Sequence, residues 1–315
     1  MSLAHLGPIA SHHQYEEPKA YAEYLMSKAG SSFAFGMRML PEQRRAGIFA
    51  VYAFCRVVDD IADEPGEVAE KKALLKAWRE EIDLLYKGTP ASLVGRALLQ
   101  PVNDYKIPKQ EFLLMIDGME ADVDGPLIVE TMTDLLSYTR QVAGTVGMMS
   151  IRIFGVSDKP ARDVFALNLA DAFQLTNVLR DVDEDADINR LYLPRDLLKE
   201  HGINLFEPKA VAENPNLRPV RRVIGKLARA RFNAARRALE DLPGEPLRSA
   251  LIMMGVYETY LERMEVVDFD RDESKLKMSK LEKVWHGLRY AWFFPKRPIH
   301  DSQQIDYPLA DIEPS

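Results

Sequence analysis

Residues 46–58 read AGIFAVYAFCRVV, a run that is apolar on almost every side of a helix, and the acidic sequence DDIADE follows directly at residues 59–64. A helix that is hydrophobic all round is typical of the centre of a bundle rather than of its surface. The run is also too short for a membrane span, which needs ~20 apolar residues. The stretch therefore predicts a buried helix in a globular, helical protein.

Helical periodicity continues on both sides of this run, from about residue 18 to residue 292. Breakers such as Pro65-Gly66, Gly125-Pro126 and Pro243-Gly244 divide the chain into helix-sized segments. Alternating strands and a fixed internal repeat are both absent from the sequence pattern. We therefore expect an all-α fold, with a longer connection between Glu200 and Pro219.

The polar residues of the first buried segment form one narrow stripe. Arg45, Tyr52, Arg56, Asp59 and Asp63 follow one another at steps of 7, 4, 3 and 4 residues, which keeps them on one side of a helix. Charged side chains on a buried helix need partners. The stripe therefore indicates a site for an ion or a charged ligand.

A second segment repeats this pattern. Residues 163–179 read DVFALNLADAFQLTNVL, and they are again nearly all apolar. The polar residues on its helical edge are Asp171, Gln174, Asn177, Asp181 and Asp185. The last three are spaced i, i+4 and i+8, so they continue along one side of the helix.

Two such helices facing each other would gather five oxygen ligands in one cavity. Their carboxylates could stay ionised together only with cations between them. Oxygen ligands at this density favour Mg²⁺, which prefers to share substrate phosphates. The sequence therefore predicts a magnesium-dependent diphosphate site made by Asp59, Asp63, Asn177, Asp181 and Asp185.

Structural explanations stand beside these functional ones. A single acidic cluster is as often a solvated face or a helix cap as a ligand set. Arg56 and Arg180 would either pair with the neighbouring aspartates or contact a diphosphate, to which guanidinium geometry is suited. Tyr52 and Tyr257 are equally consistent with core tyrosines and with functional ones.

Composition excludes other classes of function. The net charge of −7 argues against a nucleic-acid partner, because binding to phosphate polymers needs a basic surface. The lone Cys55 lies in an apolar run, which suits a reducing compartment. The first residues lack the basic start and apolar stretch of a secretory signal. We therefore expect a cytoplasmic protein without an integral membrane span.

Three motifs resemble the squalene and phytoene synthase family. SSFAFGMRMLPEQRRAGIFAVYAFCRVVDDIADE at residues 31–64 is similar to the family's first signature, and QLTNVLRDVDEDADINRLYLP at residues 174–194 is similar to the second. YTRQVAGTVG at residues 138–147 is similar to the segment between them. The resemblance implies one isoprenoid synthase domain, a helical bundle around a central cavity, at residues 20–292. An N-terminal segment (1–19) and a Pro-rich tail (293–315) would flank it.

The resemblance also implies roles for individual residues. The five oxygen ligands would hold Mg²⁺. The catalytic residues would be the four aspartates among them and two tyrosines: Asp59, Asp63, Asp181, Asp185, Tyr52 and Tyr257. The residues implied to contact substrate are Ser32, Phe33, Tyr52, Arg56, Tyr138, Gln174, Arg180, Tyr257, Lys277 and Lys280.

The expected chemistry is ionisation of an allylic diphosphate. Arginine and Mg²⁺ would stabilise the departing diphosphate. The faces of Phe33, Tyr52, Phe54, Phe173 and Tyr257 would stabilise the carbocation that remains.

GMMSIRIFG at residues 147–155 and RDVDEDA at residues 180–186 resemble the bacterial branch of the family that joins two farnesyl diphosphates into presqualene diphosphate for hopanoid synthesis. The alternatives are phytoene or dehydrosqualene synthesis and a non-catalytic helical subunit. Because substrate and product are lipids, we expect peripheral contact with the inner membrane and with downstream isoprenoid enzymes.

Overall fold

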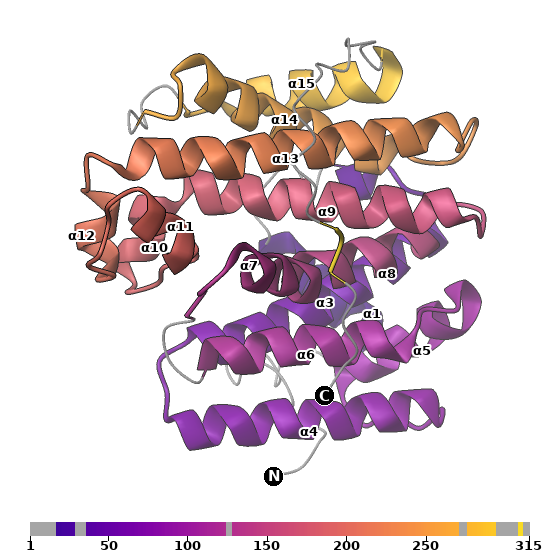
Figure 1. Ribbon diagram of the computed structural model, residues 1–315. Helices are drawn as coiled ribbons and strands as arrows, with labels where there is room; N and C mark the ends of the chain where they lie inside the picture. Colours follow the sequence, from indigo (N-terminus) through magenta and orange to yellow (C-terminus); the bar gives the residue numbers. More distant parts are fainter. Residues whose placement is uncertain (1–16, 29–35, 124–127, 271–275, 294–307, 311–315) are drawn as a thin grey trace. The chain divides into compact units, whose positions relative to one another are not determined.

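A computed structural model describes residues 17–28, 36–123, 128–270, 276–293 and 308–310 (Figure 1). Within these residues the regular structure is helical and contains no strand, which confirms the all-α fold. The contacts divide the described chain into two compact units. The first unit comprises its residues up to 123 together with 145–157, and the second comprises 128–144 and the described residues from 158 onward.

The first unit is built around α3. Helix α3 (Glu42–Asp63) packs against all the other labelled helices of this unit. These helices are α1 (Pro18–Lys28), α4 (Val68–Tyr86), α5 (Leu93–Tyr105), α6 (Lys109–Val123) and α8 (Thr145–Ile153). The central position of α3 explains why its sequence is apolar on nearly every side, as predicted.

The second unit is built around α9 (Pro160–Arg180). This helix packs most extensively against α13 (Leu217–Glu240) and also contacts α14 (Arg248–Val266) and α7 (Met132–Thr139). Figure 1 shows α9, α13, α14 and α15 (Lys280–Phe293) as successive layers. Three short helices complete the unit: α10 (Val182–Asp187), α11 (Arg195–Glu200) and α12 (Pro208–Ala212).

Local sequence signals account for several helix ends. Thr131 and Asp134 form a reciprocal capping box at the start of α7, and Ser92 caps α5 by accepting a hydrogen bond from Gly95 N. The first residue of α9 is Pro160, whose missing N–H costs nothing at that position. Capping residues and a proline thus account for the starts of α5, α7 and α9, whereas Pro101 and Pro219, which the sequence pattern predicts as breakers, lie inside α5 and α13.

A buried carboxylate joins two helices of the first unit. Glu81 on α4 is fully buried, and it accepts hydrogen bonds from the backbone N–H groups of Ala91 and Ser92 and from the Ser92 hydroxyl. The same serine caps α5. The N-terminus of α5 is therefore held by a satisfied, buried acid.

Two features differ from a simple helical reading of the sequence. Residues Arg140–Gly144 form a π-helix, η3, between α7 and α8, and the boundary between the two units follows Gly144. The expected long connection between Glu200 and Pro219 is interrupted by α12 and ends where α13 begins. The predicted boundaries at residues 20 and 292 stay predictions, because most of the flanking segments lie outside the described residues.

None of the described helices combines the length and the apolar character that crossing a bilayer requires.

Candidate active site

The first acidic motif lies at the C-terminal end of α3. Tyr52 and Asp59 are half-buried, whereas Asp63, in the last turn, is exposed. Burial raises the pKa of the Tyr52 hydroxyl, so this group is neutral at physiological pH. The structure thus places the predicted stripe on one helix and opens it to solvent at its acidic end.

Arg56 contacts two aspartates on its own helix. Its guanidinium lies 2.6 Å from Asp60 and 3.5 Å from Asp59, and its side chain is about half exposed (48%). An exposed guanidinium in such pairs contributes little to stability and can exchange partners readily. Arg56 is therefore held near Asp59 and remains accessible to a ligand.

Two residues of the same segment belong to the core or its margin. Phe54 is fully buried and makes edge-on ring contacts with Trp78 and Phe112 at centroid distances of 5.5 and 5.0 Å. The expectation that Phe54 faces a carbocation is therefore wrong, since its ring is enclosed by core aromatics. Burial raises the pKa of the Cys55 thiol to about 12, which makes it a poor nucleophile at neutral pH.

The second motif spans a break between two helices. Helix α9 ends at Arg180 and α10 begins at Val182, with Asp181 in a non-helical conformation between them. The i to i+4 backbone hydrogen bonds nevertheless persist on both sides, from Asp181 N to Asn177 O (2.8 Å) and from Asp185 N to Asp181 O (2.7 Å). The kink therefore keeps the three predicted ligands in helical succession.

Arg180 forms a two-pronged ion pair with Asp181. Its Nε and Nη2 donate to the two carboxylate oxygens of Asp181, each at 2.6 Å, and its guanidinium lies 5.1 Å from the centre of the Tyr260 ring. Burial alone would lower the pKa of Arg180, but the bonds to Asp181 outweigh it and the pKa is raised. Arg180 is thus a permanently charged, partly buried cation beside the motif.

The side-chain oxygen atoms of Asp185 and Asn177 are less well stabilised by neighbouring groups than those of Asp181, which Arg180 binds. Burial, followed by the neighbouring charge of Asp181, raises the pKa of Asp185 to about 7. The buried Oδ1 atom of Asn177 accepts no hydrogen bond from the described residues, while Nδ2 of the same side chain donates weakly to Gln174 at 3.4 Å. A buried carbonyl oxygen without a donor is costly unless something else binds it.

Aromatic side chains from α9, α13 and α14 pack together next to the second acidic motif. Phe173 and Tyr257 stack at 4.4 Å, Phe232 lies 6.2 Å from Phe173, and Tyr260 lies edge-on to Tyr257 at 6.4 Å. The structure therefore brings together two of the predicted cation-stabilising rings, Phe173 and Tyr257. Tyr260 joins this group to Arg180.

Tyr138 and Asp171 are buried in the second unit. Tyr138 stacks on Tyr192 at 5.0 Å. Asp171 accepts a hydrogen bond from the Thr139 hydroxyl at 2.6 Å and lies 3.2 Å from Arg231 Nε, although burial still raises its pKa. These contacts connect α7 and α13 to the predicted stripe of α9.

The remaining predicted residues fall elsewhere. Lys280 is exposed at the start of α15, and Lys277 is exposed just before that helix, where its backbone O accepts a hydrogen bond from Arg263. Ser32 and Phe33 lie outside the described residues. The proposed roles of these four residues stay predictions.

Sequence reasoning missed three residues that belong to this region. Tyr192 and Tyr260 are the ring partners of Tyr138 and Tyr257, and the buried Arg221 on α13 donates to Leu179 O near the end of α9. The three-residue spacing of Tyr257 and Tyr260 is a signal that they share a helix face. Tyr192 lies within the second motif but far along the chain from Tyr138, and Arg221 is 42 residues from Leu179, so helical spacing does not reveal these contacts.

A pocket of about 480 Å³ lies in the first unit, between the starts of α1 and α3 and helix α5. Its lining includes Glu42, Gln43 and Asp104, but none of the predicted site residues. Glu42 and Gln43 lie at the opposite end of α3 from Asp59 and Asp63, and Asp104 lies on α5. The pocket is therefore separate from the acidic motif.

The donor set of the motifs suits a hard cation. Within the residues described, no group of three or more His, Cys, Asp or Glu side chains is close enough to hold a metal ion, and the two acidic motifs belong to different units. The second motif nevertheless presents oxygen donors only, including the unsatisfied Oδ1 of Asn177. This chemistry fits Mg²⁺, and the gathering of both motifs around it stays a prediction.

The fold is that of an isoprenoid synthase. A crystal structure of a dehydrosqualene synthase in complex with a ligand is similar to this chain, with a TM-score of 0.76 and 26% identity. The similarity covers 89% of this chain and 98% of that one.

Sequence comparisons give the family. Residues 26–282 match the squalene/phytoene synthase family model. The presqualene diphosphate synthase of Zymomonas mobilis is 37% identical, over 87% of this chain and 96% of its own length. The phytoene synthase of Thermus thermophilus is 34% identical, over 85% and 91% respectively. The chain belongs to the squalene/phytoene synthase family of prenyltransferases.

Proposed function

We propose that this protein condenses two molecules of farnesyl diphosphate, head to head, into presqualene diphosphate. Family membership supports a prenyltransferase that uses isoprenoid diphosphates. The relative from Zymomonas mobilis, named for the presqualene product, supports the choice of two C15 substrates. The proposed reaction rests on these relatives, and the structural observation that supports a metal at the second acidic motif is the unsatisfied, buried Oδ1 of Asn177, which suits an electropositive ligand.

The proposed ligands of Mg²⁺ are Asp59, Asp63, Asn177, Asp181 and Asp185. When bound, Mg²⁺ would neutralise the negative charge that builds up on the diphosphate as the C–O bond breaks. Arg56 is half-exposed beside Asp59 and would add charge-assisted hydrogen bonds to the phosphate oxygens. Arg180 and Gln174 would orient the diphosphate from the second motif.

The reaction separates charge, and different residues would stabilise each part. The allylic C–O bond breaks, its electron pair leaves with the diphosphate, and a delocalised carbocation remains. The stacked rings of Phe173 and Tyr257 would stabilise this cation through their faces. The double bond of the second farnesyl diphosphate then supplies the electron pair of a new C–C bond, and loss of a proton closes the cyclopropane ring of presqualene diphosphate.

Two associations belong to the same proposal. The prenyl chains and the product are lipids, so the enzyme would contact the inner membrane peripherally and pass its product to a downstream isoprenoid enzyme. Apolar side chains at the protein surface would mediate this contact, and their limited area would keep it reversible.

Product analysis tests the proposal. The purified protein would be incubated with Mg²⁺ and either farnesyl or geranylgeranyl diphosphate, without a reductant, and the lipids identified by mass spectrometry. We expect C30 presqualene diphosphate from farnesyl diphosphate, and no product when a chelator removes the metal. Preferential formation of a C40 product from geranylgeranyl diphosphate would favour the phytoene branch, which the Thermus thermophilus relative represents. Failure to convert either substrate would favour a non-catalytic subunit.

A further inference from the structure

Helix α15 carries an apolar stripe on its outer side. Leu281, Trp285, Leu288 and Trp292 are spaced i, i+4, i+7 and i+11, so at ~100° per residue they share one side of the helix. Leu281 is 82% exposed, Trp285 66% and Trp292 47%. A stripe with this spacing is normally the buried side of a helix, and here most of it lies in solvent.

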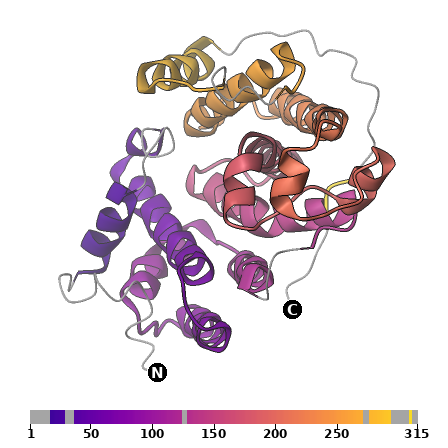
Figure 2. The same ribbon diagram turned by 90° about the vertical axis from the view of Figure 1, so that its left-hand side faces the viewer.

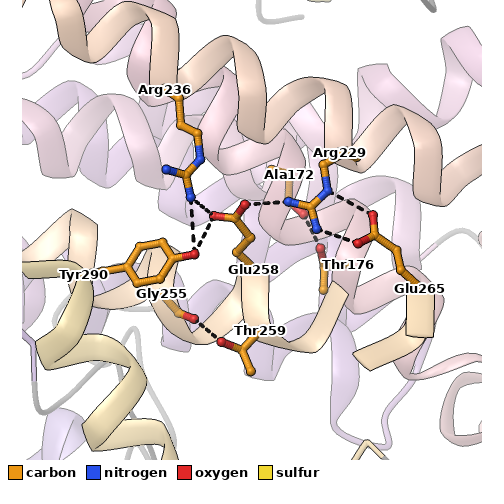
Figure 3. Close-up of polar contacts among 9 residues, drawn as sticks. All are labelled: Ala172, Thr176, Arg229, Arg236, Gly255, Glu258, Thr259, Glu265 and Tyr290. Atoms are coloured by element: carbon orange, nitrogen blue, oxygen red, sulfur yellow. Dashed lines mark hydrogen bonds and ion pairs between the residues drawn. The ribbon is translucent and has the colours of Figure 1, made fainter. Parts of the chain in front are cut away.

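The inner side of α15 is anchored, which fixes the direction of the stripe. Tyr290 is almost fully buried, and its hydroxyl donates to Glu258 on α14 at 3.0 Å (Figure 3). Arg236 on α13 donates to the same hydroxyl oxygen at 3.2 Å. Tyr290 lies ~140–180° around the helix from Leu281, Trp285 and Trp292, so the stripe points away from this network.

Two glycines at the α14–α15 contact also fix the helix. A Cβ atom on Gly255 would come within 2.5 Å of His286 O, and a Cβ on Gly287 would come within 2.8 Å of Ile252 Cγ2. The two helices therefore pack too closely for α15 to rotate and bury its tryptophans. Figure 2 shows α15, in yellow, at the end of its helical stack.

The charges along α15 are mainly basic. Lys280, Lys283 and Arg289 accompany the single acid Glu282, whose carboxylate is already bound by Arg263 at 2.8 Å. Arg248 on α14 adds a cation 5.3 Å from the centre of the Trp292 ring. This local positive character contrasts with the net charge of −7 of the whole chain.

We infer that the outer side of α15, defined by Leu281, Trp285, Leu288 and Trp292, docks on a lipid bilayer that contains anionic headgroups. Indole rings are enriched at the boundary between headgroups and acyl chains, and basic side chains beside them bind anionic lipid. A second copy of this chain is a poorer occupant, because it would bring like charges together along the stripe. This inference rests on the proposed function in one respect: access to lipid substrates is the reason why the protein would dock on a membrane.

Tryptophan fluorescence gives a direct readout. Of the three tryptophans, Trp78 is fully buried in the first unit, while Trp285 and Trp292 are exposed on α15. On addition of phosphatidylcholine vesicles that contain phosphatidylglycerol, we expect a blue shift of the emission and quenching by brominated acyl chains. Absence of both changes would overturn the inference.

Variants locate the surface in a vesicle co-sedimentation assay. The double variant Trp285→Ser with Trp292→Ser should lose about tenfold or more in vesicle partitioning. Arg289→Glu should weaken binding to anionic vesicles and leave binding to phosphatidylcholine alone unchanged. The matched control Leu205→Ser, which alters an exposed leucine (75%) elsewhere in the same unit, should bind as the wild type does.

Two further results would overturn the inference. One is equal vesicle binding by the double variant and the wild type while circular dichroism shows both folded. The other is wild-type protein that ignores vesicles but dimerises through these tryptophans, as measured by light scattering. Turnover in detergent without vesicles keeps the proposed reaction and the docking inference apart. An active enzyme that ignores vesicles contradicts the docking inference and the proposed membrane contact but leaves the proposed reaction standing. A vesicle-bound protein without turnover contradicts only the proposed reaction.

Discussion

Asp185 and Asp187 are two residues apart near the end of α10, and only Asp185 continues the predicted ligand stripe. Asp187 is largely exposed and pairs with Lys209 at 3.2 Å. We predict that Asp185→Asn lowers turnover at least about a hundredfold, because it removes a ligand that stabilises the departing diphosphate. Asp187→Asn, the matched control, should stay within about twofold of the wild type. Steady-state kinetics with Mg²⁺ would measure both, and similar losses in the two variants would contradict the assignment.

Glu282 supplies a pH-dependent contact at the start of α15. Its carboxylate accepts a hydrogen bond from Ser279 N at 2.7 Å and pairs with Arg263, and the pKa of Glu282 is lowered from 4.5 to about 2, first by the bond from the Ser279 backbone. A lowered pKa means that the folded state favours the ionised form. The stabilisation is therefore complete above pH 4.5 and is lost as the pH falls towards 2.

We predict that Glu282→Gln has a lower melting temperature than the wild type at pH 6 and that the difference shrinks as the pH is lowered to 3. Glutamine keeps the shape of the side chain but loses the charge that Arg263 binds. Thermal unfolding followed by circular dichroism at several pH values would measure this. A difference that does not change with pH would show that the charge of Glu282 is unimportant.

At the scale of helices, a buried ionic network joins α13, α14 and α15 (Figure 3). Glu258 is almost fully buried and lies between Arg229 and Arg236, while Arg229 also binds the partly exposed Glu265 at 2.7 and 2.9 Å. A buried acid with two guanidinium partners is well compensated as long as all three groups are present.

We predict that Glu258→Gln destabilises the protein by about 3–5 kcal/mol, because it removes the buried carboxylate that both Arg229 and Arg236 contact. Glu265→Gln, which removes a more exposed partner of the same Arg229, should cost about 1 kcal/mol or less. Urea unfolding would compare the two free energies. Equal costs would mean that burial does not determine the strength of these pairs.

The central helices could be predicted from the sequence because burial leaves a direct mark on it. Residues 46–58 and 163–179 are apolar on nearly all sides, and each lies within the helix that has the most packing partners in its unit. The break at Asp181 and the π-helix at Arg140–Gly144 could not be predicted. Both are local departures from α-helical geometry in segments whose residues are otherwise compatible with a continuous α-helix.

At the scale of the whole molecule, the sequence pattern predicted which site residues follow one another along a helix. It did not predict which residues from distant segments contact them. Helical spacing predicted the succession of Asn177, Asp181 and Asp185, which the backbone hydrogen bonds confirm, while their role as ligands stays a prediction. The pairing of Tyr138 with Tyr192, and the burial of Phe54 against Trp78 and Phe112, depend on contacts between distant segments. Such contacts have no local sequence signature, so the pattern alone did not separate core aromatics from site aromatics.

The two acidic motifs belong to separate compact units, and the proposed chemistry requires that they act as one site. The most direct test is calorimetric binding of unreactive farnesyl thiodiphosphate with Mg²⁺ to the wild type, Asp63→Asn, Asp185→Asn and the double variant. If both motifs hold the same diphosphate, each single change should abolish most of the binding and the double variant should be little worse than either. Independent, additive losses, or a loss confined to one motif, would contradict a shared site.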